Sequence, residues 1–273
     1  MIRRNRITGD PLFLAPGRAA RPNAFRNALE RCPFCPGAES DTPPEIWRDG
    51  DPWSVRVVPN KYPATERHEI VIEAREHEAT FDLLSPDHAA RVVNVWVERY
   101  GMLQSAGGWT CIFKNQGQAA GASMPHLHSQ LLATPFIPPR IAREASAFRA
   151  APRCPLCSLD DEPLIAATAH FRWIAPRGSS MACEQWIVPR THGPEVAGID
   201  GLAALLQQST RAMHSVAGGF NWMFLQFPGE PAAHWYVQIL PRTSILAGFE
   251  LASGSAINAV EPERVAAEFG RFG

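Results

Sequence analysis

Two cysteines and two histidines occur in the same order twice in this chain, and this repeat constrains the fold more than any other feature. The first set is Cys32, Cys35, His77 and His126, and the second is Cys154, Cys157, His192 and His234. Each set consists of a C-x-x-C pair, a lone histidine, and a histidine that opens an H-x-[HY]-x-Q segment. The sequence therefore predicts two copies of one structural unit.

The chemical character of each set indicates zinc. Two thiolates from a C-x-x-C turn and two neutral imidazoles make a tetrahedral shell that balances the charge of the ion. A redox C-x-x-C pair or unliganded thiols would leave the repeated histidines unexplained. Because four protein ligands close each shell, we expect two structural zinc sites. Thiolates used in this way are typical of a reducing compartment, so we expect a cytoplasmic protein.

The two copies differ at one position that matters for chemistry. The first reads H-L-H-S-Q and carries His128, whereas the second reads H-W-Y-V-Q and carries Tyr236 in its place. Residues two apart on a strand point to the same face, so His126 bound to a metal would fix the backbone beneath His128. A positioned neutral imidazole can attack phosphorus, which predicts His128 as a nucleophile. The alternatives are that His128 is a second metal ligand or a packed core histidine.

Polar and small residues around this segment are candidate ligand contacts. Gln130 shares the face of His128 and can bond a transferred phosphoryl group. Gly121 and Ala122 allow a phosphate to approach the backbone, and the Ser123 hydroxyl can donate to it. Four other residues are either ordinary loop and turn residues or contacts to a nucleotide diphosphate: Arg18, Arg21, Asn60 and Asn115. Four histidines without a repeat partner are expected at the surface or in packing: His68, His88, His170 and His214.

The segments between the repeated ligands predict the same order of elements in each copy. In the first copy we expect strands at 53–59, 68–73, 109–114 and 126–134, and a helix that begins after Ser85 and ends at Gly107. In the second copy we expect strands at 171–176, 184–189, 221–227 and 234–240, and a helix at 201–216. A helix-prone connection spans 135–153, and a short helix is expected at 262–269. These elements predict an α+β protein whose halves share one antiparallel sheet.

The charge balance excludes some classes of function. The chain carries 26 basic and 27 acidic side chains, a formal charge of -1. No basic surplus exists to bind a nucleic-acid backbone, although a local arginine cluster can still hold a small anion. No run of about 18 apolar residues occurs, so no membrane span is predicted. The polar N-terminal segment does not predict a secretory signal.

Seven segments together resemble the galactose-1-phosphate uridylyltransferase family of the histidine-triad superfamily. They are Arg3–Gly9, Pro16–Pro22, Cys32–Gly37, Pro59–Ala64, Phe113–Gly117, Gly121–Gln130 and Gly248–Gly254. The best-known uridylyltransferase branch has a second metal site built from histidines and a carboxylate. The cysteine-containing second set here, with the FKNQG and GASM motifs, is more similar to the ADP-glucose phosphorylase branch. The resemblance implies two tandem histidine-triad-like units, 1–140 and 141–273, each an antiparallel sheet with helices packed on one side.

The resemblance also implies an activity. A nucleotide sugar would give its nucleoside monophosphate, UMP or AMP, to His128, and a hexose 1-phosphate or inorganic phosphate would then accept it in a ping-pong reaction. Carried over by position, Gln130 and Ser123 contact the phosphate, and Gly121 and Ala122 belong to the same loop. The remaining positions are assigned to the diphosphate (Arg18, Arg21), the nucleotide pocket (Asn60, Asn115) and a sugar-contacting loop (Phe249, Glu250).

Other activities and an assembly also follow from these expectations. In the family, the sugar-contacting loop can reach the site of a partner subunit, which implies a homodimer. A nucleotide-sugar or dinucleotide hydrolase, with water as the acceptor, is an alternative activity. A zinc-stabilised nucleotide-binding module without catalysis is a second alternative.

Overall fold

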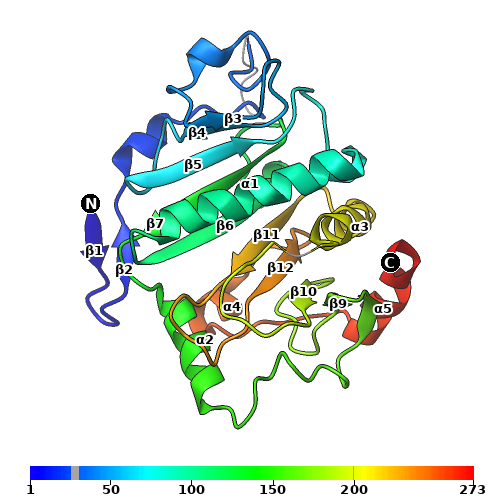
Figure 1. The fold of residues 1–273 in the computed structure, drawn as a ribbon. Coiled ribbons are helices and arrows are strands. Elements are labelled where there is room, and N and C mark those ends of the chain that lie inside the picture. The colour runs from blue at the N-terminus through cyan, green and yellow to red at the C-terminus, as the bar shows by residue number, and fades with distance from the viewer. Residues whose placement is uncertain (26–30, 199) are drawn as a thin grey trace.

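A single antiparallel sheet forms the centre of the computed structural model, which describes residues 1–25, 31–198 and 200–273 (Figure 1). Ten strands lie in the order β3-β4-β5-β7-β6-β11-β12-β10-β9-β8. The first five are β3 (Trp47–Arg48), β4 (Arg56–Pro59), β5 (Arg67–Ile72), β6 (Trp109–Gln116) and β7 (His128–Thr134). The other five are β8 (Leu164–Ala167), β9 (Phe171–Ile174), β10 (Gln185–Pro189), β11 (Phe220–Leu225) and β12 (Tyr236–Pro241).

The strand order is the same in the two halves of the sheet. Read from either outer edge inward, an edge strand is followed by two antiparallel neighbours, then by the strand that follows the last histidine of each set, then by the central strand. The central strands β6 and β11 pair with each other from Phe113↔Met223 to Gln116↔Phe220 and thereby join the halves. The prediction of one shared antiparallel sheet is therefore confirmed.

Two helices cover one face of the sheet (Figure 1). They are α1 (Pro86–Gln104) and α3 (Leu202–His214), and they contact each other. Ser85 caps α1 by accepting a hydrogen bond from the His88 amide, as the sequence predicts. Trp96 of α1 packs among sheet residues such as Trp222 and Phe224 in the main hydrophobic core. The removal of these apolar side chains from water drives the association of the helices with the sheet.

Three further helices lie outside this layer. Helix α2 (Pro139–Ala150) connects the halves, α4 (Gly248–Ser253) lies in the C-terminal segment, and α5 (Pro262–Phe269) packs near β8. A two-stranded hairpin, β1 (Ile2–Arg4) with β2 (Pro11–Phe13), stands apart from the main sheet near the N-terminus (Figure 1). The predicted helices at 135–153 and 262–269 are confirmed, whereas β1, β2, β3, β8 and α4 were not predicted.

Three predicted strands were placed too early in the chain. The first strand begins at Arg56 rather than at position 53, because residues 49–54 form a tight turn closed by the Asp49 side chain. The fourth strand begins at His128, so His126 lies just before β7 and not on it. Its counterpart β12 likewise begins at Tyr236, two residues after His234. In both halves the metal-type histidine therefore precedes the strand.

The face of the sheet opposite α1 carries the residues that build the site. Arg56 of β4 pairs with Ile72 of β5, which pairs with His128 of β7. In the next row Val58, Ile70 and Gln130 are paired in the same way. Because paired residues in antiparallel strands share a face, these two rows form one surface beside the first C-x-x-C segment. The opposite-facing residues Val57, Val71 and Leu131 lie in the main core.

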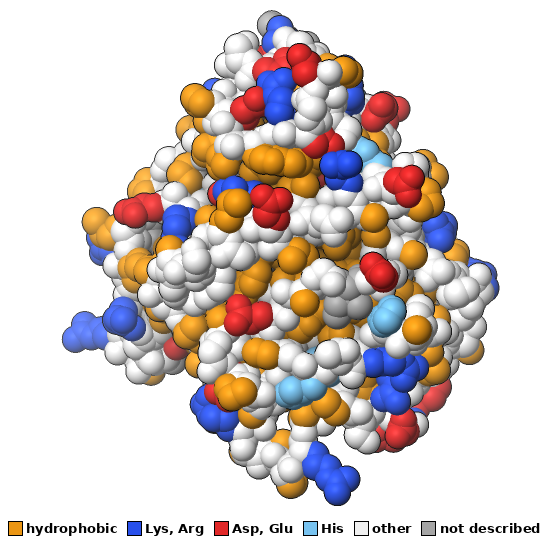
Figure 2. Space-filling view, in the orientation of Figure 1, with side chains coloured by type: hydrophobic (Ala, Val, Ile, Leu, Met, Phe, Trp, Pro, Cys, Tyr) orange, Lys and Arg blue, Asp and Glu red, His pale blue; other side chains and the backbone are white. Residues whose placement is uncertain are grey.

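No helix among the described residues has the length and apolar character that a membrane crossing requires. On the helix-bearing side of the molecule, acidic and basic side chains are scattered among each other (Figure 2). This distribution agrees with the near-zero formal charge and forms no basic stripe on the face shown.

Candidate active site

The first cysteine–histidine set comes together just before β7. Nδ1 of His126 lies 3.7 Å from Cys32 Sγ and 3.6 Å from Cys35 Sγ. Nδ1 of His77 lies 3.3 Å from Cys35 Sγ. The Nε2 atom of His126 bonds the Ala74 carbonyl oxygen at 2.8 Å. Since a carbonyl only accepts, Nε2 carries the proton and the Nδ1 lone pair faces the sulfurs.

The second set repeats this geometry. Nδ1 of His234 lies 3.7 Å from Cys154 Sγ and 3.6 Å from Cys157 Sγ, and Nδ1 of His192 lies 3.3 Å from Cys157 Sγ. The Nε2 atoms of both histidines face backbone carbonyl oxygens at 2.9 Å. Backbone acceptors of this kind fix the tautomer and orientation of a ligating imidazole.

Both sets can hold a metal ion. All four ligand atoms in each set lie within 4.8 Å of one another. Tetrahedral bonds of roughly 2.3 Å to sulfur and 2.0 Å to nitrogen would separate neighbouring ligands by about 3.5 Å. The sulfur–nitrogen distances given above bracket that value in both halves. Thus the residues that the sequence singled out as ligands converge without rearrangement.

His128 is held in one tautomer beside this centre. Its Nδ1 lies 2.7 Å from the His126 backbone oxygen, so Nδ1 carries the proton and the lone pair is on Nε2. Burial lowers the pKa of His128 to about 4, although the bond to the His126 carbonyl opposes that shift. The imidazole is therefore neutral at physiological pH and can act as a nucleophile through Nε2.

A buried ion pair supports the backbone of His128 from the other side of the sheet. Lys114 Nζ donates to the His128 carbonyl oxygen at 2.9 Å and lies 2.7 Å from Glu73 Oε2. The two charged side chains are 1% and 0% exposed. Burial lowers the pKa of Lys114, and the Glu73 carboxylate opposes this shift. This pair was not predicted, because the two residues are 41 positions apart and belong to no shared motif.

A cavity of about 430 Å³ opens over the two rows of residues on β4, β5 and β7. This volume lies in the range of small-molecule sites. One wall is polar and contains Arg21, Gly121, Ser123, His128 and Gln130. The floor and sides are apolar and contain Phe34, Val58, Ile70 and Met124. The far wall is the turn formed by Ser40, Asp41, Thr42 and Pro43.

Two arginines, Arg21 in the polar wall and Arg18 close to it, bring positive charge to this side of the cavity. Burial lowers the pKa of Arg21, and the charge of Arg18 lowers it further. Arg18 Nη1 donates to the Tyr62 carbonyl oxygen at 2.7 Å. Among the described residues, neither guanidinium forms an ion pair. An anion in the cavity would supply the missing negative charge.

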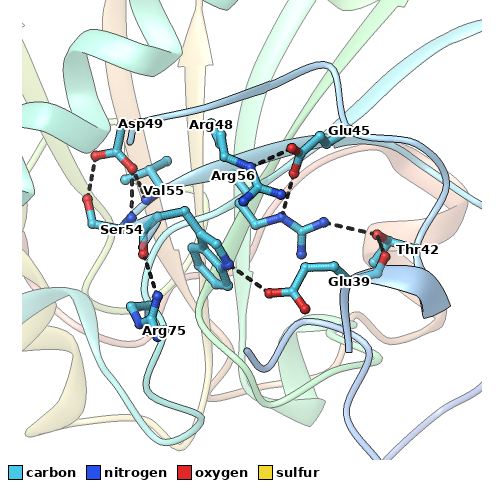
Figure 3. Close-up of polar contacts among 10 residues, drawn as sticks. Glu39, Thr42, Glu45, Arg48, Asp49, Ser54, Val55, Arg56 and Arg75 are labelled. Atoms are coloured by element: carbon cyan, nitrogen blue, oxygen red, sulfur yellow. Dashed lines mark hydrogen bonds and ion pairs between the residues drawn. The ribbon is translucent and has the colours of Figure 1, made fainter. Parts of the chain in front are cut away.

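The far wall is held by a network of charged and polar side chains (Figure 3). Arg56 is 1% exposed, and it donates to Glu45 Oε2 at 3.0 Å and to Thr42 Oγ1 at 3.3 Å. Arg48 reaches the other oxygen of Glu45. The Thr42 hydroxyl in turn donates to the Glu39 carbonyl oxygen at 2.8 Å. The guanidinium of Arg56 therefore connects the sheet to the turn that closes the cavity.

The indole of Trp53 completes this network. Its Nε1 donates to Glu39 Oε1 at 2.9 Å, and its ring lies 5.3 Å from the Arg56 guanidinium carbon. Arg75 lies 5.5 Å from the same ring and donates to the Trp53 carbonyl oxygen (Figure 3). These contacts order a segment with little regular secondary structure of its own.

Comparison with known proteins adds to this geometry. Residues 57–138 match the family described as galactose-1-phosphate uridyl transferase, N-terminal domain. ADP-glucose phosphorylase of Arabidopsis thaliana is 29% identical across 97% of this chain and 91% of that protein. The crystal structure of an Arabidopsis thaliana ADP-glucose phosphorylase with bound ADP-glucose superposes with a TM-score of 0.82 over 99% of this chain and 98% of that one, again at 29% identity. The chain resembles the galactose-1-phosphate uridylyltransferase family, with the match to the family confined to residues 57–138.

More distant proteins are also similar to this chain. Galactose-1-phosphate uridylyltransferase of Thermotoga maritima is 24% identical over 70% of this chain and 67% of that protein. A solved uridylyltransferase structure has the same fold, with a TM-score of 0.83 over 99% of this chain and 97% of that one at 23% identity. The near full-length similarity at 29% identity is to ADP-glucose phosphorylase.

Not every residue that the sequence motifs singled out reaches the cavity. Arg21, Asn60, Gly121, Ser123, His128 and Gln130 line it. Ala122 is buried beside them, and Arg18 lies behind Tyr62. Asn115 is instead paired across the central strands, where its Oδ1 accepts from Asn221 Nδ2 at 2.8 Å. Phe249 and Glu250 lie on α4, where Glu250 accepts from the Ala247 amide.

Among the described residues of the second half, helix α2 fills the region that corresponds to the site. Tyr236, the counterpart of His128, is 4% exposed and donates to Glu144 of α2 at 3.2 Å. Arg140 of the same helix donates to Gln238 Oε1 at 2.8 Å. Side chains of α2 thus occupy the position that the cavity holds in the first half.

Proposed function

We propose that this protein transfers a nucleoside monophosphate from a nucleotide sugar to a phosphate acceptor through a covalent nucleotidyl-His128 intermediate. The observation that carries the proposal is the fixed tautomer of His128, which leaves the Nε2 lone pair at the wall of a cavity lined by Arg21, Ser123 and Gln130. The names of the similar proteins, ADP-glucose phosphorylase and galactose-1-phosphate uridylyltransferase, support the same reaction class.

The first half-reaction forms a bond between His128 Nε2 and the α-phosphorus of the nucleotide sugar. The bond from that phosphorus to the bridging oxygen breaks, and its electron pair leaves with the sugar 1-phosphate. The positive charge that develops on the imidazole is stabilised because Nδ1–H donates to the His126 carbonyl oxygen. Gln130, Ser123 and Arg21 are positioned to bind the non-bridging and leaving oxygens.

The second half-reaction reverses the bond changes. An oxygen of the acceptor phosphate attacks the phosphorus, the N–P bond breaks, and its electron pair returns to Nε2. The acceptor is either inorganic phosphate or a hexose 1-phosphate. The near full-length similarity to ADP-glucose phosphorylase supports adenylyl transfer to phosphate, with uridylyl transfer as the other candidate.

We also propose zinc in both cysteine–histidine sets, with a structural role. Each set offers two sulfurs and two imidazole nitrogens at tetrahedral spacing, which leaves no position for substrate. When bound, the ions would fix the segments before β7 and β12 and take no part in group transfer. All six cysteines are free, as expected for a cytoplasmic protein.

We further propose that the chain consists of two tandem histidine-triad-like units, 1–140 and 141–273, and that it acts as a homodimer. The division lies within α2. In the single chain, the apolar side chains of the loop around α4 are exposed, with Ile245 94%, Phe249 59% and Leu251 70% accessible. A second copy would cover them and receive Phe249 and Glu250 at its site. Sedimentation of the protein at several concentrations tests this assembly.

Intact-mass analysis after incubation with a nucleotide sugar tests the covalent intermediate. A panel of ADP- and UDP-sugars should give one nucleoside monophosphate of added mass in the parent and none in His128→Ala. An unmodified parent, or an adduct that persists in His128→Ala, would refute the proposal. Exchange of labelled sugar 1-phosphate into the nucleotide sugar separates the transferase from a hydrolase, which shows no exchange, and a binding module forms no adduct at all.

A further inference from the structure

His68 is a buried residue of β5 whose ring contacts the proposed phosphate-binding amide. It is 3% exposed, although the sequence suggested a surface or packing role. Its Nε2 lies 2.9 Å from Oε1 of Gln130. Its Nδ1 accepts a hydrogen bond from the Ala64 backbone amide at 3.1 Å. Both ring nitrogens are therefore engaged by fixed partners.

These contacts determine the tautomer of His68. A backbone N–H can only donate, so Nδ1 of His68 is unprotonated and Nε2 carries the proton. Burial lowers the pKa of His68 to about 4, which keeps the ring in this neutral form. The Asn60 amide nitrogen lies 3.2 Å from Nε2, but it is itself a donor because Asn60 Oδ1 accepts from the Tyr62 amide. The acceptor for His68 Nε2–H is thus Gln130 Oε1.

The consequence is a defined orientation of the Gln130 side chain. With its carbonyl oxygen bonded to His68, Gln130 leaves its NH2 group for the cavity that it lines. An NH2 group donates to phosphoryl oxygens, whereas a carbonyl oxygen would repel them. Glutamine has nearly the same shape in both orientations, so its neighbour decides which group faces the ligand.

The second half of the chain provides an internal comparison. Gln238 pairs with Trp186 in the register in which Gln130 pairs with Ile70. Glu184 lies two residues before Trp186, as His68 lies two residues before Ile70. There the carboxylate of Glu184 accepts from Gln238 Nε2 at 2.6 Å, and the amide has the opposite orientation. Gln238, the counterpart of Gln130, therefore turns its NH2 group toward its neighbour, because that neighbour is a hydrogen-bond acceptor.

We propose that His68 is a positioning residue that turns the amide of Gln130 so that its NH2 group meets the transferred phosphoryl group. The inference rests on the proposed nucleotidyl transfer. It predicts that His68 acts only through Gln130, without touching the substrate.

Single-turnover formation of the nucleotidyl enzyme measures this role. Removing one donor to a developing charge typically slows a reaction about 10²–10³-fold, which is the loss we expect for Gln130→Ala. His68→Leu should lose a similar factor in rate with little change in KM, and the double variant should be no slower than Gln130→Ala. His68→Glu should be slower than His68→Leu because it imposes the orientation of the second half. His68→Gln, which can still donate, should recover part of the rate.

The outcomes separate the two proposals. If the parent protein forms no nucleotidyl-His128 adduct, the proposed function fails and this inference fails with it. If the adduct forms but the rate losses of His68→Leu and Gln130→Ala multiply in the double variant, only the role of His68 is overturned. A His68→Glu variant as fast as His68→Leu overturns it as well. Glu184→Gln is the matched control and should leave the rate unchanged, and thermal unfolding checks that every variant is folded.

Discussion

The buried ion pair behind the nucleophile offers a quantitative test of how the site is supported. Lys114 and Glu73 are 1% and 0% exposed and 2.7 Å apart. At an effective dielectric constant of about 20, two unit charges at this distance attract by about 6 kcal/mol before desolvation is subtracted. Lys114→Met removes this attraction and leaves the Glu73 carboxylate buried and unpaired. Such single removals cost about 3–5 kcal/mol, so we expect a loss of that size in the free energy of unfolding.

A double-mutant cycle separates the pair from the cavity left by either residue. Urea unfolding of the parent, Lys114→Met, Glu73→Leu and the double variant should give a coupling of at least about 2 kcal/mol, because the double variant contains no buried unpaired charge. The exposed pair Arg264–Glu268 serves as the control, and Arg264→Met should leave the unfolding curve unchanged.

Additive effects would refute the reasoning about Lys114. If the double variant were destabilised by the sum of the two single changes, Lys114 and Glu73 would not be stabilising each other as charges. A coupling of the size of a neutral hydrogen bond, about 1 kcal/mol, would indicate an uncharged pair instead. Nucleotidylation rates of the same variants then report whether the Lys114 bond to the His128 carbonyl oxygen also positions the imidazole.

Three further predictions follow from local geometry. An alanine Cβ at Gly108 would lie 1.9 Å from the Thr134 carbonyl oxygen, whereas Gly107 has a similar positive φ and open space around it. Gly108→Ala should therefore lower the free energy of unfolding by about 1–3 kcal/mol more than Gly107→Ala. Equal losses in the two variants would contradict the contact. Arg56→Met should raise KM for the nucleotide sugar up to about tenfold, because Arg56 donates a hydrogen bond to Thr42 in the cavity wall. Arg48→Met should leave KM unchanged, because Arg48 makes no such bond within the described part of the chain. Equal KM values in the two variants would contradict this role of Arg56. Metal analysis of Cys154→Ala should find about one zinc ion per chain instead of about two, and this variant should be less stable than the parent. His128→Ala should keep both ions. A Cys154→Ala variant as stable as the parent would contradict the structural role of the second site.

The two cysteine–histidine sets were predictable because they are repeated, and His128 was singled out because its counterpart is not a histidine. Residues far apart in the chain, such as Cys35 and His126, could be associated only through their counterparts Cys157 and His234. Structure confirms that both sets converge. Among the differences between the repeats, the change from His128 to Tyr236 then identified a position where the halves differ in chemistry. Helix boundaries were also predictable, since Ser85 and the glycines after α1 and α3 are strong local signals.

The supporting residues could not be predicted, because sheet register decides them. His68 contacts Gln130 only because β5 and β7 pair with Ile70 opposite Gln130. Lys114 meets Glu73 across the core, and neither residue belongs to a local motif. Asn115 illustrates the reverse case, since a motif pointed to the nucleotide pocket whereas strand pairing sets it against Asn221. A one-residue shift in register would change each of these partners.

Comparison of the two halves indicates which charge a ligand of the first half should carry. Arg140 lies 14 residues before Cys154, and Arg18 lies 14 residues before Cys32. Helix α2 supplies Arg140 with its own carboxylate, Glu144, and also covers Tyr236. Among the described residues of the first half, no carboxylate pairs with Arg18 or Arg21, and the neighbouring cavity is open to His128. Both halves keep the same four metal-type ligands, so the metal set alone does not confer reactivity. The difference lies in the imidazole, the orientation of the adjacent glutamine amide, and positive charge left for a substrate phosphate to neutralise.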